Sequence, residues 1–301
     1  MRIMSASPSL TRKKKKSGSK IGFLYLLPAL IAYGYVVIVP TFQSLWFSFF
    51  KWNGITEAQW VGLNNYLGFL SNPLIKQAFS HTLVLIFFYS VLPISLGLLS
   101  AALISKTQIR FSGFFRSVIF LPQILTSVVI AVIWRQIFST DGILNDALRA
   151  VGLESLTQPW LGSFTFTLPV LGLAGSWTTM GLCMLLFISG TANISTELYD
   201  AAKLDGAGAI REFFSVTLPG LRPQLAVAMT LTLIAALRVF DLVWLTTRGG
   251  PGTSSITPSV LLYSKAFTQS DVGAGAAIGV LLAILALVVA LVIVRVMDDK
   301  D

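Results

Sequence analysis

Long apolar stretches constrain the fold of this 301-residue chain more than any other feature of its sequence. Six of them, each of 18 to 27 residues, can be counted: Ile21–Val39, Thr82–Ile104, Ser117–Trp134, Phe164–Gly190, Leu225–Thr247 and Val272–Val294. A helix needs roughly 20 residues to cross the hydrocarbon core of a bilayer. Because lipid offers the backbone no hydrogen-bond partner, each stretch must be helical. The sequence therefore predicts an all-α polytopic membrane protein with six transmembrane helices.

The composition supports this fold class. Hydrophobic residues make up 54% of the chain and charged residues only 12%, whereas a soluble domain carries about 25% charged residues. Five of the six stretches contain no charged residue. Glycines inside them would weaken a soluble helix but allow helices in a membrane to pack closely; they are Gly97, Gly172, Gly175, Gly181 and Gly279.

The distribution of lysine and arginine predicts the orientation. With the N-terminus in the cytoplasm, the cytoplasmic segments hold 15 basic residues and the outer loops six. This excess on one side is the positive-inside pattern. It places both termini in the cytoplasm, with a basic tail at residues 1–20, a six-span membrane domain at 21–297 and a short tail at 298–301.

The net charge of +9 raises the question of nucleic-acid binding. Residues 1–20 hold seven of the basic residues and no acid, so the charge is concentrated beside the first span. Such a tail is attracted to anionic lipid headgroups, and we expect membrane lipid as a partner and no nucleic acid. A secretory signal peptide is the alternative, but the 19-residue apolar run is long for one and has no small-residue cleavage site before Pro40.

A polar loop, residues 191–223, separates the fourth and fifth stretches and has the pattern of two helices. Ser195 and Thr196 are good N-cap residues for a first helix, Glu197–Leu204, in which Glu197 favours the positive end of the helix dipole. Leu198, Ala201, Ala202 and Asp205 share one face of this helix, where the two alanines leave room for another backbone.

Glycines and prolines are expected to bound the two helices. Gly206 and Gly208 can end the first helix in a left-handed conformation without strain. The second helix follows from the apolar spacing of Ile210, Phe213, Phe214 and Leu218, and Pro219 and Pro223 are expected to stop it. The loop therefore has the form of a docking element for a partner in the cytoplasm.

This loop resembles the EAA loop of ABC-transporter permease subunits, in which an acidic–Ala–Ala triplet is followed by a glycine and a closing Leu-Pro. Asp200-Ala201-Ala202, Gly206 and Leu218-Pro219 match that pattern, with Val216 where the family has isoleucine. The resemblance implies the type I ABC importer permease architecture. It also implies that the loop contacts a cytoplasmic ATPase through a set of residues comprising Leu198, Asp200, Ala201, Ala202, Asp205, Gly206 and Pro219.

Further motifs are similar to the carbohydrate-uptake branch of these permeases, the maltose and glycerol-phosphate type. They are Phe115–Pro122 with Trp134, the segment Gly142–Leu148, and the run Val239–Gly252, which contains a Phe-Asp pair and a Gly-Gly-Pro. The likeness extends over residues 20 to 297. One departure is Ser195, where relatives have a proline; serine replaces a rigid helix start with an N-cap.

The resemblance implies a complex and a mechanism. The partners would be a second permease subunit in a heterodimer, two copies of an ATPase that binds ATP and Mg²⁺, and an extracytoplasmic solute-binding protein that delivers a sugar. This chain would sit in a bacterial or archaeal inner membrane and bind no cofactor itself. Closure of the ATPase dimer would drive the coupling loops together and open the path outward.

A charged pair in the fifth stretch is the candidate for the substrate path. Arg238 lies 14 residues beyond Gln224, about 20 Å along a helix, and Asp241 follows on the same face, where the two can pair. Charges at that depth must face the bundle interior or a water-filled cavity. Two interpretations remain open: a polar wall of the path with Trp244 as a stacking platform, or a structural ion pair. Trp177 either lines the path or fills the bundle.

Other chemistry is excluded by residue counts. One histidine, His81, and one cysteine, Cys183, cannot form a His/Cys metal site or a disulfide. The chain has no P-loop motif, so we expect no enzyme activity. The alternatives are a permease for a non-sugar solute (an amino acid, peptide or polyol phosphate) and a self-contained secondary transporter. The latter would need several intramembrane carboxylates, and only Asp241 is present.

Reporter fusions test the predicted orientation. A reporter fused after residue 160 should be active on the outer side of the membrane, and one fused after residue 208 should be active in the cytoplasm. Activity of both fusions on the same side would remove the fourth span from the topology.

Overall fold

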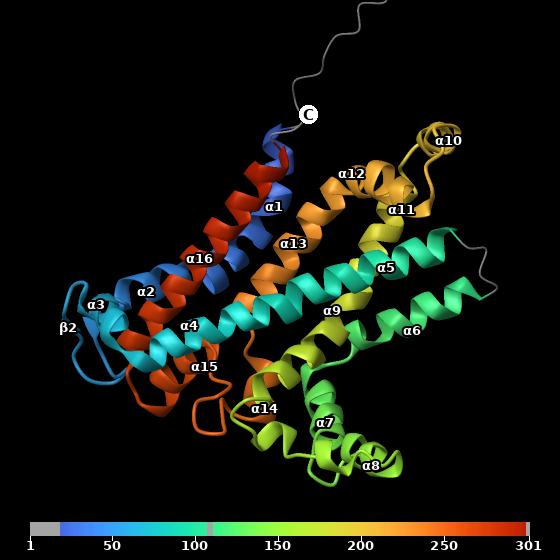
Figure 1. Cartoon of the computed structure of the whole chain (residues 1–301). Coiled ribbons are helices and arrows are strands. Elements are labelled where there is room, and N and C mark those ends of the chain that lie inside the picture. Colours follow the sequence, from blue (N-terminus) through green and yellow to red (C-terminus); the bar gives the residue numbers. More distant parts are fainter. Residues whose placement is uncertain (1–18, 107–110, 299–301) are drawn as a thin grey trace, which may run out of the picture. The chain divides into compact units, whose positions relative to one another are not determined.

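The computed structural model describes residues 19–106 and 111–298 (Figure 1). Most of the predicted basic tail at 1–20, and all of the tail at 298–301 except Asp298, lie outside the described residues. Contacts divide the chain into two compact units, residues 1–46 and residues 47–301. The fold class is all-helical, with a single two-stranded β-sheet among the described residues.

The first unit provides one candidate span. Helix α1 (Ser19–Tyr33), the π-helical turn η1 (Gly34–Ile38) and helix α2 (Val39–Phe47) follow each other without a break. The part apolar enough to cross a membrane is Tyr25–Phe47, and none of its 18-residue core is buried within the chain. The span therefore ends later than the predicted Ile21–Val39, because the helix continues through Pro40.

Three prolines, two within spans and one in the loop at 191–223, each follow a π-helical turn. Pro40, Pro93 and Pro219 each stand two residues after such a turn, namely η1, η2 (Phe87–Val91) and η5 (Phe213–Thr217). In each case the residue before the proline donates its N–H to the carbonyl five residues back, as Leu92 does to Phe87. A regular helix would bring the proline ring against the carbonyl four residues back, and the wider turn avoids this contact.

The second unit contains the remaining candidate spans. Among the residues that the structure describes, five helical segments of the whole chain are long and apolar enough to cross a membrane, and a sixth is added if a sharply bent pair is one span. The four that qualify as single segments in this unit are Pro73–Ile104, Thr167–Thr191, Arg222–Thr246 and Val272–Met297. They correspond to the predicted second, fourth, fifth and sixth stretches.

The predicted third span, Ser117–Trp134, is not one straight helix. It is divided into α6 (Ser112–Ile124) and α7 (Ser127–Ile137), which meet at 101°. Leu125 and Thr126 between them are extended, with ψ angles of 143° and 150°. The two halves pack against different partners, α6 against α9 (Thr167–Thr191) and α7 against α14 (Asp241–Thr246). Hydropathy could not reveal this bend, because both halves are equally apolar.

Helix α9 packs along α5 (Leu92–Lys106) and η2 through glycines. A Cβ on Gly97 would lie 2.6 Å from the Cβ of Cys183, and one on Gly175 would lie 2.1 Å from the ring of Tyr89. Cys183 is fully buried at this contact, where its small side chain packs against α5. The close packing expected of the span glycines is confirmed here.

The sheet lies in the segment between the first two spans. Strands β1 (Phe50–Lys51) and β2 (Gln59–Trp60) form an antiparallel hairpin, which is followed by α3 (Asn64–Ser71). The hairpin contacts the start of α16 (Val272–Asp298), where Val272 donates its N–H to the carbonyl of Trp52 at 2.8 Å. A Cβ on Gly273 would collide with the backbone of Phe50, so this approach requires glycine.

Candidate functional site

The loop between the fourth and fifth spans begins with a capped helix. Helix α10 (Thr196–Leu204) starts at Ser195, whose side chain accepts a hydrogen bond from the N–H of Glu197 at 3.3 Å. It ends at Gly206, which has a φ of +74°, and Ala207 donates its N–H to the carbonyl of Ala202 at 2.9 Å. The predicted N-cap and the predicted left-handed terminus at Gly206 are both confirmed. The left-handed conformation expected of Gly208 was wrong, because this residue is extended with a φ of −72° and a ψ of 171°.

The second arm of the loop is longer than predicted. Helix α11 (Ala209–Glu212), η5 and α12 (Leu218–Gly220) form one continuous helical run. Pro219 does not stop it, because η5 accommodates the proline, and this expectation was wrong. Pro223 lies in the first turn of α13 (Arg222–Leu237), where its missing N–H removes no helical bond, so it belongs to the next helix.

The residues expected to contact an ATPase are mostly accessible. Leu198, Asp200, Ala201, Asp205, Gly206 and Pro219 are exposed, and Ala202 is half-buried. Leu204 and Leu198 expose 89% and 56% of their surface. Such exposure of leucine is typical of a helix surface that another protein covers. Figure 1 shows α10 at the end of α9, away from α7 and α8 (Ile143–Ala150). The loop therefore presents an apolar helix face at one end of this unit.

The fifth span is broken between its two charged residues. Helix α13 ends at Leu237 and α14 begins at Asp241. Phe240, between them, has a φ of −128° and a ψ of −63°. Arg238 and Asp241 therefore do not share a helical face, and the described residues form no ion pair between them. The predicted pairing was wrong, because it assumed an uninterrupted helix.

Asp241 instead contacts the broken third span. Its Oδ2 accepts a hydrogen bond from Ser127 Oγ at 3.4 Å, and Ser127 is the first residue of α7. The breaks in the third and fifth spans thus lie next to each other. The sequence analysis missed Ser127; the signal available was Thr126-Ser127 after Pro122, since Thr and Ser are common at helix starts.

Arg238 borders a separate cavity of about 560 Å³. The walls come from α13, from α15 (Pro258–Tyr263) and from α16, and include Phe240, Tyr263 and Ser259. Trp244 lies in the same aromatic cluster, with its ring 4.6 Å from that of Tyr263 and 5.8 Å from that of Phe240. An exposed guanidinium beside aromatic rings offers both hydrogen-bond donors and a stacking surface.

Trp177 lies in α9 and packs with a second aromatic group. Its ring meets that of Trp134 edge-on at 5.7 Å, and Trp134 stacks on Phe138 at 5.0 Å. Trp177 is half-buried and packs against the main apolar core. These contacts favour the bundle-filling interpretation of Trp177, which stays partly accessible.

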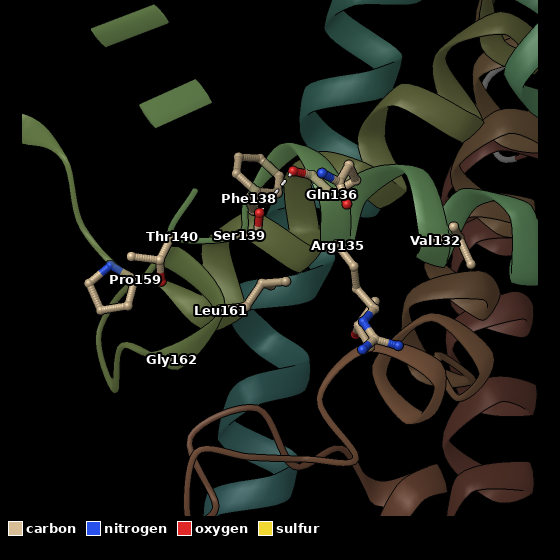
Figure 2. A pocket seen from close by; sticks show the side chains of 10 residues that line it. Val132, Arg135, Gln136, Phe138, Ser139, Thr140, Pro159, Leu161 and Gly162 are labelled. Carbon is tan, nitrogen blue, oxygen red and sulfur yellow. Dashed lines mark hydrogen bonds between the residues drawn. The ribbon is translucent and has the colours of Figure 1, made fainter. Parts of the chain in front are cut away.

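A second cavity, of about 580 Å³, lies at the end of α7. Figure 2 shows Arg135 and Val132 on one side of it and Pro159 and Leu161 on the other. The adjoining segment is fixed by Asn145, which is 1% exposed. Its amide nitrogen donates to the carbonyls of Thr140 and Gln158, and its oxygen accepts from Trp160 Nε1 at 2.8 Å. The side-chain amide of Asn145, in the Gly142–Leu148 motif, therefore connects this motif to the segment that contains Gln158 and Trp160.

The segment that contains Gly-Gly-Pro is hydrogen-bonded to α4 (Pro73–Ile86). Thr253 Oγ1 donates to Gln77 Oε1 at 2.9 Å, and His81 Nδ1 donates to the carbonyl of Ile256 at 2.8 Å. Within the segment, Ser255 is fully buried and donates to the carbonyl of Gly250. The segment is therefore a fixed connection between α14 and α15, and it holds Arg248 5.8 Å above the ring of Trp244.

Comparison with known proteins identifies the family. The family described as "Binding-protein-dependent transport system inner membrane component" matches residues 93–300. A probable ABC transporter permease protein of Bacillus subtilis, YurN, is 35% identical over 87% of this chain and 90% of its own length. The trehalose/maltose transport system permease protein MalF of Thermococcus litoralis is 33% identical over 91% of this chain and 92% of its own.

This chain belongs to that family. It is a permease subunit of a binding-protein-dependent ABC transporter, a multi-pass inner-membrane protein and not the ATPase. A chain from the crystal structure of a bacterial ABC transporter that imports the acidic polysaccharide alginate has the same fold, with a TM-score of 0.81 at 20% identity, covering 93% of this chain and 96% of that one. The predicted type I importer permease fold is confirmed.

The permease offers no metal centre within its described residues, which contain no group of three or more His, Cys, Asp or Glu side chains suited to one. The candidate functional groups described above are the polar side chains at the two broken spans and those on the loop of α10.

The broken helix gives a sharp prediction for Arg238 and Asp241. Because the two side chains make no pair, the losses caused by Arg238→Gln and Asp241→Asn should add in the double variant. Each loss of a charged hydrogen-bonding group should weaken uptake roughly tenfold, since such bonds contribute about 1.5–3 kcal/mol. Uptake into proteoliposomes is the measurement, with Arg149→Gln on α8 as a control for loss of charge. Recovery of uptake in the double variant would show that the two residues pair after all.

Proposed function

We propose that this permease forms the translocation path of an ATP-driven sugar importer. The likeness to the trehalose/maltose permease of Thermococcus litoralis carries this proposal, because it extends over nearly the full length of both chains. Other relatives are a lactose permease of Rhizobium radiobacter and a multiple sugar-binding transport permease of Streptococcus mutans. Sugars as a class, rather than one sugar, are the substrate that these relatives support.

The candidate path has groups suited to sugars. Arg238 presents donors beside the rings of Phe240 and Tyr263 at one cavity, and Trp244 belongs to the same aromatic cluster. A sugar offers hydroxyls to charged groups and C–H faces to aromatic rings. Asp241 contributes an acceptor at the neighbouring break. We propose Arg238, Asp241 and Trp244 as path residues, whereas Trp177 serves mainly in packing.

The loop that contains α10 is proposed to couple this subunit to the ATPase. It has an accessible helix that carries the Asp200-Ala201-Ala202 triplet and exposed leucines, and both ends of the loop continue directly into spans. ATP and Mg²⁺ would bind to two copies of the partner ATPase. Closure of that dimer would move the two coupling loops together and reopen the path to the outside.

Two further partners complete the proposed complex. A second permease subunit would form the other half of the path, and the first span supports this partner, because none of its apolar core is buried within the chain itself. A solute-binding protein would deliver sugar from the outer side, in keeping with the description of the family. We propose that both termini and the loop of α10 lie in the cytoplasm, which the positive-inside pattern supports.

The class of substrate can be tested with the whole complex. The permease is reconstituted with its partner subunits, and the ATPase rate is measured with binding protein preloaded from a panel of oligosaccharides, amino acids, peptides and polyol phosphates. We expect stimulation and uptake with saccharides. Stimulation by amino acids, peptides or polyol phosphates alone would overturn the sugar assignment and leave the importer assignment intact.

Coupling can be tested at Gly206 with a matched control. Gly206 has a φ of +74° and open space around its Cα, whereas Gly208 has open space and a φ of −72°. Gly206→Val should therefore strain only the backbone at the end of α10, by about 1–2 kcal/mol, and Gly208→Val should not. We expect Gly206→Val to lower the sugar imported per ATP hydrolysed while the subunit stays in the membrane. Equal coupling in both variants would contradict the role of the loop.

A further inference from the structure

The two arms of the coupling loop are held together at their base by close packing. A Cβ on Gly220 would lie 2.6 Å from Ile194 Cδ1, and one on Gly190 would lie 2.5 Å from Leu221 Cδ2. The end of α9 and the start of α13 therefore touch at glycines, where no side chain separates them. Leu221 is 1% exposed. This base joins two spans to the loop as one packed body.

Beyond the base, a side-chain hydrogen bond joins the two arms. Tyr199 Oη in α10 lies 3.2 Å from Thr217 Oγ1, the last residue of η5. Thr217 is 3% exposed and Tyr199 is half-buried, so this bond is partly buried. Apolar packing cannot fix α10 by itself, because Leu198 and Leu204 on the same helix remain largely exposed.

A cavity gives α10 room to move if this bond opens. It has a volume of about 790 Å³ and is lined by both Tyr199 and Thr217, together with Thr196, Phe213 and Arg116 of α6. Open space on this side of α10 means that steric contact does not prevent the helix from tilting toward α6. The connections on either side of α10, at 192–195 and at 205–208, contain non-helical residues at which such a tilt could occur.

We propose that the hydrogen bond between Tyr199 and Thr217 braces the coupling loop, so that displacement of α10 by the ATPase moves α9 and α13 with it. This inference rests on the proposed coupling role of the loop and names two positioning residues for it. With the brace closed, α10, η5 and the packed base move as one body. With the brace open, α10 tilts into the cavity, and part of its displacement is lost before it reaches the spans.

Removal of either hydroxyl tests the brace. In the reconstituted complex, Tyr199→Phe and Thr217→Val should each lower the sugar imported per ATP hydrolysed by up to about fivefold, the equivalent of the roughly 1 kcal/mol that a neutral hydrogen bond contributes. Thr217→Ser keeps the hydroxyl and should keep the coupling ratio. Ser215→Ala is the matched control, because Ser215 is exposed two residues away and its hydroxyl bonds only the carbonyl of Arg211 among its described contacts.

The double variant and hydrogen exchange separate a brace from a general loss of stability. Tyr199→Phe with Thr217→Val should lower the ratio no further than either change alone, because both remove the same bond. Exchange of the α10 amides should become about fivefold faster in each variant, while the amides of α9 stay protected. An unchanged ratio in Tyr199→Phe, an additive double variant, or failure of the single variants to assemble with the ATPase would each overturn the proposal.

Comparison with Gly206→Val distinguishes failure of the brace from failure of the proposed coupling role of the loop. If Gly206→Val uncouples transport and Tyr199→Phe does not, the loop couples without the brace. If neither variant changes the ratio, the coupling role of the loop is refuted together with the brace.

Discussion

Backbone hydrogen bonding within lipid is the constraint on which the rest of this structure depends. Every N–H and C=O in the hydrocarbon core needs a partner in the protein, so the apolar stretches are helical and prolines inside them require local adjustment. Pro40 and Pro93 are accommodated by π-helical turns rather than by breaks. The two positions where spans do break, Leu125–Thr126 and Arg238–Phe240, lie beside each other through Ser127 and Asp241. The polar groups that are not used in regular helical hydrogen bonds thus lie close together, at these two neighbouring breaks.

That concentration links the fold to transport. A solute with many hydroxyls can cross only where the helices offer polar groups, and the broken spans place Asp241, Arg238 and the aromatic cluster around Trp244 in one part of the bundle. The loop of α10 has a different character. Glycine contacts at its base and the hydrogen bond between Tyr199 and Thr217 hold it against the spans that it connects.

Much of the architecture could be predicted from the sequence, and the failures share one cause. Apolar length predicted the spans, and Ser195 and Gly206 predicted both ends of α10. The straight third span, the pairing of Arg238 with Asp241 and the stop at Pro219 were wrong. Each assumed regular helix geometry over the whole segment. The bend in the third span arises because α6 packs on α9 while α7 packs on α14, and neither contact is visible in a local pattern.

The sequence by itself determined the family, the all-helical membrane fold and the position of the coupling loop, because hydropathy, capping residues and motif spacing are local properties of the chain. Only the tertiary structure decided which polar side chains meet. Ser127 reaches Asp241, Asn145 holds the segment around Trp160, and Tyr199 reaches Thr217 across 18 residues. These contacts depend on how helices cross and where they break, and crossing and breaking are set by packing between segments that are distant in the sequence.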